Sequence, residues 1–441
     1  MKKPVALLLL VIFLPARVRD SKVVGPSNPG AQTKGVTFPA SVGAPGSVSA
    51  QPSDLSALSG YEGALAARGE KLQDQGILIE TMDGHQVLAN QNADTPFNPA
   101  SVMKLATSYA ALSKFGPDYR FRTNFFAAGP LENVGGRPDR KLDGDLVVEG
   151  DNDPMFSAAD AEEVAHQLAG LGISRVTGNL RIAGQFTYFA TGYRENLSPQ
   201  TSAEKLKTGL ARGGVRIDGG ITFGDESGTL LLSHYSDQLI RILLFQNAHS
   251  SNAIAEVVGQ AAGGAVAIQN SLIHNLGLAE QDVFVGRPSG LDFNRITPRA
   301  ALKVVKGLIT LLAKYALTLQ DMMPVAGVDS GTLRGRFAED DLKGAIIAKT
   351  GTLMSLDGGV STLVGMANTK RGPLLFAIFD SAGSINQYRR LQDQFLEKVV
   401  EEEGGPVPVW RVEDELANYK GGSIIQVTHN RGVPAPERAA D

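Results

Sequence analysis

Hydrophobic residues recur at helical spacing in several segments of the chain. Residues 101–116 are apolar on most sides, which predicts a core helix that starts at or next to Ser101 and ends by Gly116 and Pro117. Residues 385–402 carry apolar positions on one side only, which predicts an amphipathic helix. Further helices are predicted over residues 54–68, 158–171, 202–212, 236–247 and 252–262.

Short apolar runs bounded by turn residues predict strands elsewhere. Residues 76–82 and 85–90 are separated by Asp83 and Gly84, which favour a hairpin. A strand over 345–348 is followed by Lys349, Thr350 and Gly351. Two more strands are predicted near 360–367 and 373–380.

The pattern changes from about Phe125 to His234. In this span short strands alternate with glycine turns and two short helices, which is typical of a separate, mostly-β domain inserted into another domain. We therefore expect an inserted domain at 125–234 and a main domain made of residues 54–124 and 235–404. Residues 405–441 are expected to form a loosely held tail.

The N-terminal segment has the features of an export signal. Lys2 and Lys3 precede an apolar run from Val5 to Leu14, which is too short to cross a bilayer. We assign residues 1–18 to a signal peptide and the Gly-, Pro- and Ser-rich residues 19–53 to a flexible linker. Since no later segment is long and apolar enough for a membrane span, the mature protein is expected to be periplasmic.

Composition excludes several classes of function. The formal net charge is −4 and the isoelectric point is about 5.9, which argues against a nucleic-acid partner. The chain has no cysteine, so disulfides, thiol catalysis and cysteine-ligated zinc are excluded. Its six histidines form no cluster along the sequence, and no metal or organic cofactor is implied.

Three motifs occur in an informative order. Ser101 to Lys104 (SVMK) comes first, Ser250 to Asn252 (SSN) follows, and Lys349 to Gly351 (KTG) is the third. Each motif alone is weak evidence, because such short matches occur by chance. In this order they form the signature of serine enzymes that open an acyl-D-Ala-D-Ala bond or a β-lactam ring.

A second pair of motif matches shows what chance produces. Ser202 to Lys205 (SAEK) is followed at once by Lys207 to Gly209 (KTG). The chemistry requires the third motif on a sheet edge that faces a separate helix, so two motifs on one element cannot form a site. We interpret residues 202–212 as a surface helix with Ser202 as N-cap and a stop at Gly213 and Gly214.

The first motif supplies a nucleophile and a base. A serine hydroxyl reacts only when a base removes its proton, and Lys104 lies one helical turn from Ser101. Burial disfavours the charged form of a lysine, so Lys104 can be neutral near pH 7. The chain has no G-x-S-x-G sequence, and His249 is interpreted as a helix-surface histidine.

The other two motifs supply polar groups around the reacting bond. Ser250 offers a hydroxyl that can relay a proton to the leaving amine, and the Asn252 amide can bind Lys104 and the substrate backbone; the alternative for Ser250 is a helix cap. Lys349 adds positive charge, and Thr350 and Thr352 offer hydroxyls to a terminal carboxylate. Gly351 would let the substrate lie against the strand, whereas the alternative for this motif is a β-turn. The N–H groups of Ser101 and Thr352 are the expected oxyanion hole.

The chain resembles the D-alanyl-D-alanine carboxypeptidase/endopeptidase family, the class C low-molecular-mass penicillin-binding proteins. The resemblance runs from about residue 55 to 400 and is carried by NPASVMKLATSYAAL, QNAHSSNAIAE, PVAGVDSGTLRGRF and IIAKTGTL, and in the insert by GDLVVEGDNDP and VTGNLRI. By position it makes Ser101 the nucleophile, Lys104 the base, and the second and third motifs the rest of the site.

The resemblance also implies a fold, a location and ligands. The expected fold is mixed α/β (α+β): a β-lactamase/transpeptidase-like helix–sheet–helix domain with an antiparallel sheet, plus the inserted domain. The substrates would be peptidoglycan stem peptides, and β-lactam antibiotics would be inhibitors. The chain departs from the family pattern in its shorter insert, in Arg287 and Pro288 before Ser289, and in LDGGVSTLVG after the third motif.

Two other functions share these motifs. A β-lactamase would have to deacylate rapidly, and its class A form uses a glutamate on a loop ahead of the second motif. The large insert and the family-like flanking segments argue against that reading. A non-catalytic peptidoglycan-binding or scaffold protein could keep the same fold, although the intact catalytic residues argue against it.

Overall fold

A computed structural model of the chain describes residues 56–133, 140–190, 196–338, 342–409, 414, 416 and 421–428. The expected signal peptide (1–18) and linker (19–53) lie outside the described residues. Within the described part of the chain, no helix combines the length and apolar character needed to cross a membrane.

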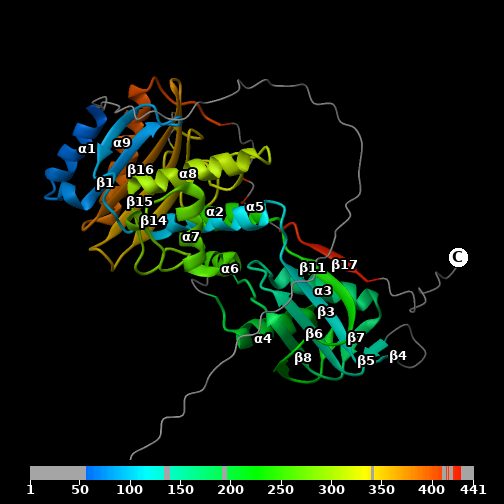
Figure 1. Cartoon of the computed structure of the whole chain (residues 1–441). Helices are drawn as coiled ribbons and strands as arrows, with labels where there is room; N and C mark the ends of the chain where they lie inside the picture. The colour runs from blue at the N-terminus through cyan, green and yellow to red at the C-terminus, as the bar shows by residue number, and fades with distance from the viewer. Residues whose placement is uncertain are drawn as a thin grey trace, which may run out of the picture. The chain divides into compact units, whose positions relative to one another are not determined.

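A five-stranded antiparallel sheet lies in the part of the chain for which the sequence predicts a main domain (Figure 1). The strand order is β14–β15–β16–β1–β2, so β1, drawn in blue, pairs with a strand about 300 residues later in the sequence. β14 has only one neighbour in the sheet and is therefore an edge strand. The strands are β1 (Gln75–Thr81), β2 (Val87–Gln91), β14 (Ile346–Leu353), β15 (Val360–Thr369) and β16 (Gly372–Ser381).

Helices cover both faces of this sheet. α1 (Ser56–Ala66) and α9 (Ile385–Glu402) pack on one face, and α8 (Pro298–Ala313) packs on the other (Figure 1). Alternate residues of β1 enter different cores: Ile77 and Ile79 pack with α1 and α9, whereas Leu78 packs with α8. The expected mixed α/β helix–sheet–helix fold with an antiparallel sheet is confirmed.

A group of helices carries the first two motifs. α2 (Met103–Phe115) is almost wholly buried, as its apolar sequence predicts, and contacts α5, α6, α7 and α8. Its neighbours are α5 (Leu239–His249), α6 (Asn252–Ala262) and α7 (Gly264–Leu276), with short strands β12 (Val283–Phe284) and β13 (Arg295–Ile296) nearby. The remaining short elements are 3-10 turns at Leu72–Asp74 (η1), Ala100–Val102 (η2), Glu280–Asp282 (η3) and Leu319–Asp321 (η4).

Among its described residues, the region predicted to be inserted has two sheets, two helices and a core of its own; β17 (Ile424–Val427), from the C-terminal segment, joins the larger sheet. The larger sheet has the order β10–β8–β6–β3–β11–β17, with β6, β8 and β10 parallel to one another, and the smaller has the order β4–β5–β7–β9. The strands are β3 (Arg122–Ala128), β4 (Leu131–Asn133), β5 (Arg140–Leu142), β6 (Asp145–Asp151), β7 (Ile173–Val176), β8 (Leu180–Gln185), β9 (Arg216–Ile217), β10 (Ile221–Phe223) and β11 (Thr229–Tyr235); the helices are α3 (Ala158–Gly170) and α4 (Pro199–Arg212).

The start of α4 differs from the prediction. Ser198, not Ser202, is the N-cap, because its Oγ accepts a hydrogen bond of 3.1 Å from the N–H of Thr201. Pro199 occupies the first helical position, where its fixed φ suits a helix and no N–H is needed. Ser202 lies inside the helix with its side chain buried, whereas the predicted stop at Gly213 is confirmed.

The C-terminal segment also differs from the expected loosely held tail. Its described residues include β17 (Ile424–Val427), which pairs antiparallel with β11 and becomes an edge strand of the larger inserted sheet. The Ser423 hydroxyl donates to Asp160 of α3 at 2.8 Å, and Arg120 donates to the carbonyl of Gly422 at 2.6 Å. Strand pairing therefore holds this segment, because β11 would otherwise expose an unpaired edge.

Candidate active site

Ser101 lies in the 3-10 turn η2, directly before α2. Lys104 lies in the first turn of α2 with its side chain fully buried, and its Nζ is 2.9 Å from Ser101 Oγ. The i, i+3 spacing therefore brings the two groups together, as the sequence predicts.

The turn that carries Ser101 has a constrained backbone. Ala100 has a φ of 48°, in the left-handed region that L-residues rarely adopt. Its N–H donates to Asn98 Oδ1 at 3.0 Å, and Thr362 Oγ1 of β15 donates to the Pro99 carbonyl at 2.8 Å. These hydrogen bonds fix the turn that carries Ser101 and connect it to β15.

Lys104 Nζ has three polar neighbours. Besides Ser101 it donates to Asn252 Oδ1 at 2.7 Å and to the carbonyl of Ser289 at 2.6 Å. Burial lowers the pKa of Lys104 to about 7, and the charge of Glu256 opposes this shift. A substantial fraction of this amine is therefore neutral at pH 7 and can accept a proton from a neighbouring hydroxyl.

The second motif lies between two helices. Ser250 is the C-cap of α5 in the left-handed conformation, with a φ of 54°, and Asn252 is the first residue of α6. Ser251 is the N-cap of α6, because its Oγ accepts from the N–H of Ile254 at 3.3 Å. The structure therefore excludes the alternative that Ser250 caps this helix and leaves its hydroxyl 2.9 Å from Lys349 Nζ.

The third motif lies within the edge strand β14, which excludes the β-turn alternative. The prediction ended the strand at residue 348, whereas β14 continues to Leu353. Lys349 is fully buried, and its Nζ donates to Ser250 Oγ at 2.9 Å and to the Thr350 carbonyl at 2.8 Å. Burial and the charge of Lys104 hold the pKa of Lys349 well below its usual range.

The free edge of β14 directs peptide groups away from β15. The N–H of Ala348 donates to the Pro324 carbonyl at 3.3 Å on that edge. Because peptide groups alternate along a strand, the N–H groups of Thr350 and Thr352 point to the same edge. This is the orientation that the expected oxyanion hole requires of Thr352.

Gly351 faces the turn that carries Ser101. A Cβ at this position would lie 2.1 Å from Thr362 Oγ1 and 2.6 Å from the Pro99 carbonyl oxygen. The sequence predicted that this glycine lets the substrate lie against the strand. In the structure its missing side chain allows β14 to pack against the turn that carries Ser101.

The hydroxyls of Thr350 and Thr352 project from one face of β14, since the two residues are two positions apart. Thr350 Oγ1 donates to Thr332 Oγ1 at 2.8 Å. Thr352 Oγ1 accepts a hydrogen bond of 2.7 Å from Nη2 of Arg389, which belongs to α9. The third motif is therefore connected to two segments that the sequence interpretation did not include in the site.

The sequence analysis did not assign four groups near the site: the Ser289 carbonyl, Glu256, Thr332 and Arg389. Glu256 accepts from the Ser289 N–H at 3.2 Å and from Arg287 Nε at 3.2 Å, so the unusual Arg287 helps to hold the loop that contacts Lys104. Thr332 belongs to the segment PVAGVDSGTLRGRF, whose family-like sequence was a usable signal. No local pattern marked Arg389.

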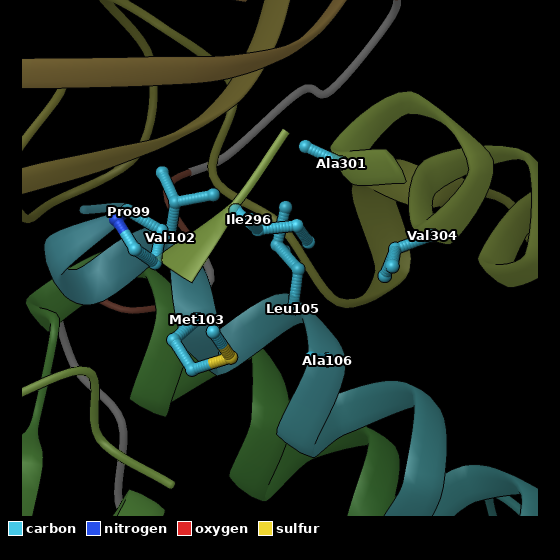
Figure 2. Close-up of a pocket in the computed structure, with 8 residues that line it drawn as sticks. All are labelled: Pro99, Val102, Met103, Leu105, Ala106, Ile296, Ala301 and Val304. Atoms are coloured by element: carbon cyan, nitrogen blue, oxygen red, sulfur yellow. The ribbon is translucent and has the colours of Figure 1, made fainter. Parts of the chain in front are cut away.

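A small apolar cavity of about 10 Å³ lies beside the turn that carries Ser101 (Figure 2). Figure 2 shows that apolar side chains of the turn, α2 and α8 line it, including Val102, Leu105 and Val304. A cavity of this size and lining is a packing gap and offers no polar groups to a ligand. Among the described residues, no group of three His, Asp or Glu side chains is placed to hold a metal ion.

Comparison with known proteins shows the family of the chain. Residues 63–196 and 193–399 match the D-Ala-D-Ala carboxypeptidase 3 (S13) family, so the match covers well over half of the chain. The D-alanyl-D-alanine carboxypeptidase of Actinomadura sp. (strain R39) is 23% identical over 458 residues, covering 75% of this chain and 82% of that protein. The D-alanyl-D-alanine carboxypeptidase DacB of Haemophilus influenzae is 21% identical over 404 residues, covering 67% of this chain and 83% of its own length.

Solved structures show the same fold. Bd3459, a predatory peptidoglycan endopeptidase from Bdellovibrio bacteriovorus, superposes with a TM-score of 0.62 at 21% identity, covering 77% of this chain and 95% of that one. Penicillin binding protein 4 (dacB) from Haemophilus influenzae gives a TM-score of 0.60 at 20% identity, covering 74% and 96%. At this level of identity the likeness confirms the fold alone.

Proposed function

Because the chain belongs to the D-Ala-D-Ala carboxypeptidase 3 (S13) family, we propose that it is a serine D-alanyl-D-alanine carboxypeptidase that uses Ser101 as its nucleophile. The observation that carries this proposal is the fully buried amine of Lys104, which lies 2.9 Å from Ser101 Oγ. A base at hydrogen-bond distance from a serine is the arrangement that nucleophilic catalysis requires.

Acylation follows from this geometry. The neutral amine of Lys104 takes the proton of Ser101 as Oγ forms a bond to the carbonyl carbon of the penultimate D-Ala. The N–H groups of Ser101 and Thr352 stabilise the oxyanion. Collapse of the tetrahedral intermediate breaks the C–N bond. The proton that Lys104 took from Ser101 passes through the Ser250 hydroxyl to the leaving amine, so Lys104 is neutral again, and Lys349 Nζ holds the Ser250 hydroxyl at 2.9 Å.

Deacylation reverses these roles with water as nucleophile. Water loses a proton to the regenerated neutral Lys104 and attacks the ester carbon, and Ser101 recovers its proton as the ester bond breaks. The result is a shortened stem peptide and free D-Ala. The same steps would cleave a D-alanyl cross-link, so endopeptidase activity needs no further catalytic group.

The substrates we propose are peptidoglycan stem peptides, in agreement with the activity in the names of the related proteins. A β-lactam carries a strained amide and a carboxylate in a similar arrangement and would acylate Ser101. One of the similar structures is the penicillin G acylated form of Bd3459, which supports this part of the proposal. We place this activity in the periplasm on the strength of the N-terminal sequence.

Intact-mass spectrometry with benzylpenicillin tests the proposal. The wild-type protein should gain the mass of one penicillin in a long-lived adduct, and Ser101→Ala should gain none. Ser202→Ala is the matched control, because Ser202 begins the second S-x-x-K sequence but lies inside α4. This control should form the adduct as the wild type does.

Other outcomes would contradict the proposal and identify its competitors. Rapid consumption of the drug without a lasting adduct indicates a β-lactamase. Intact drug and unmodified protein indicate a non-catalytic binding or scaffold protein. With a confirmed adduct, release of D-Ala from an acyl-D-Ala-D-Ala peptide is the direct measurement of the activity.

A further inference from the structure

Arg389 forms no ion pair of its own among the described residues, because Asp393, the acidic side chain whose charge acts on it, is paired with Arg336. It lies on α9 with its side chain half-buried, and Nη2 donates to the hydroxyl of Thr352 at 2.7 Å. Its neighbour Arg336 is paired: Arg336 Nη2 lies 2.6 Å from Asp393 Oδ1. The guanidinium of Arg389 therefore has a neutral hydroxyl as its hydrogen-bond partner, where a carboxylate would satisfy its charge.

This arrangement has an energetic cost. Burial and the charge of Arg336 lower the pKa of Arg389 and the charge of Asp393 opposes this shift, although an arginine stays protonated under all ordinary conditions. Charged side chains that are partly removed from water are normally paired. An unpaired guanidinium beside a proposed active site is therefore a candidate for binding an anion.

The other cations of the site are already engaged. Lys349 Nζ contacts Ser250 Oγ and the Thr350 carbonyl, and Lys104 Nζ contacts three oxygen atoms. Burial lowers the pKa of both lysines, and the two charges repel each other. Arg389 thus supplies the permanent positive charge next to the outer hydroxyl of the third motif.

We propose that Arg389, together with the Thr352 hydroxyl that it contacts, binds the free carboxylate of the residue that leaves during cleavage. A guanidinium presents several N–H donors in one plane, which match the two oxygens of a carboxylate. Arg389 would select substrates that carry this carboxylate over those in which it is blocked. The inference rests on the proposed function, because it names the residue that binds the terminal carboxylate of the same substrate.

A matched substrate pair isolates this interaction. The first is an acyl-D-alanyl thioester whose leaving group carries a free carboxylate, and the second is its methyl ester. For Arg389→Gln we expect kcat/KM to fall about 10- to 100-fold on the carboxylate substrate, the size of a lost charge-assisted hydrogen bond, and to change little on the methyl ester. Arg389→Lys keeps a charge without the planar donors and should recover part of the loss.

Arg390→Gln is the control, because Arg390 is the adjacent arginine of α9, equal in charge and exposed to solvent. It should behave as the wild type on both substrates. Thermal unfolding of each variant separates a folding defect from a binding defect. A methyl-ester rate that matches the wild type shows in addition that Ser101 and Lys104 are intact in Arg389→Gln.

Two results would overturn the inference while the proposed function stands. Equal losses on both substrates would mean that Arg389 only positions β14, and equal rates for Arg389→Gln and wild type would mean that it does not bind the carboxylate. If wild-type protein cleaves neither thioester and forms no penicillin adduct, the proposed function fails, and this inference fails with it.

Discussion

At the residue scale, the proposed mechanism requires a neutral Lys104 before Ser101 can react. The side chain is removed from water by the packing of α2 against α6 and by the loop that contains Ser289. Removal from water destabilises the ammonium form, which lowers the pKa to about 7. The nearby carboxylate of Glu256 opposes this shift, so the balance between burial and one acidic side chain sets the working pH.

We predict that the rate constant for acylation by benzylpenicillin depends on this pKa. Since the neutral amine is the base, the rate should rise about tenfold per pH unit below pH 7 and level off above it. Stopped-flow acylation between pH 5 and pH 9 measures this profile. In Lys104→Arg the side chain stays protonated throughout this range, so the rate should lie about 10²- to 10⁴-fold below the wild-type plateau above pH 7 and should lose the dependence on pH. A flat wild-type profile, or a midpoint near the ordinary lysine value, would contradict the assignment.

At the element scale, the site depends on how closely β14 approaches the turn η2. Gly351 permits this approach, because any Cβ there would meet Thr362 and the Pro99 carbonyl at much less than van der Waals distance. Both elements are rigid at this point: β14 is paired with β15 along its length, and η2 carries the constrained Ala100. Neither can move without disturbing Lys349 or Ser101.

We therefore predict that Gly351→Ala damages both stability and activity. Forced separation of the two elements should cost about 1–3 kcal/mol of unfolding free energy and slow penicillin acylation more than the loss of folded protein explains. Gly335→Ala is the matched control, since a Cβ at Gly335 has no atom within 4 Å. Thermal unfolding and acylation rates are the measurements. A Gly351→Ala protein with wild-type values in both would show that the elements are less constrained than described.

At the scale of the whole molecule, the C-terminal segment contacts both the main domain and the inserted sheet. Asp414 accepts hydrogen bonds from Ser330 at 2.5 Å and from Arg334 at 2.7 Å. Leu416 is buried against Leu244 and Ala248 of α5. C-terminal to these residues, β17 forms the edge of the sheet that contains β11. This short segment therefore contacts two hydrophobic clusters, one at α5 and one beneath that sheet.

We predict that a protein truncated after residue 409 is less stable than the full chain. It loses a buried leucine, worth about 1.5–3 kcal/mol, and leaves β11 as an unpaired edge. The expected result is a lower melting temperature, by about 5 °C, and a greater tendency to associate. Truncation after residue 428 is the control, since it removes none of these contacts. Equal melting temperatures for the two truncated proteins would show that the segment contributes nothing.

The sequence by itself determined the features that arise from neighbouring residues. The helix at 385–402 was predicted with its observed limits, because its apolar stripe repeats at helical spacing. The glycine of the first hairpin was placed correctly, although the turn is longer than two residues and β2 begins at Val87. The order of the three motifs predicted the class of serine enzyme, and the segments around them predicted the family. The i, i+3 spacing was enough to place Lys104 beside Ser101.

Only the tertiary structure decided which distant groups meet. The pairing of β17 with β11, the contact of Ser289 with Lys104, and the hydrogen bond from Arg389 to Thr352 join residues between 37 and nearly 200 positions apart. No local period encodes such a contact, because it depends on how whole elements pack. Even the cap of α4 was misplaced, since Ser198 and Ser202 are both plausible caps and only the backbone path shows which one meets a free N–H. Local patterns therefore specify the elements and the chemistry, whereas packing specifies the surroundings that tune this chemistry.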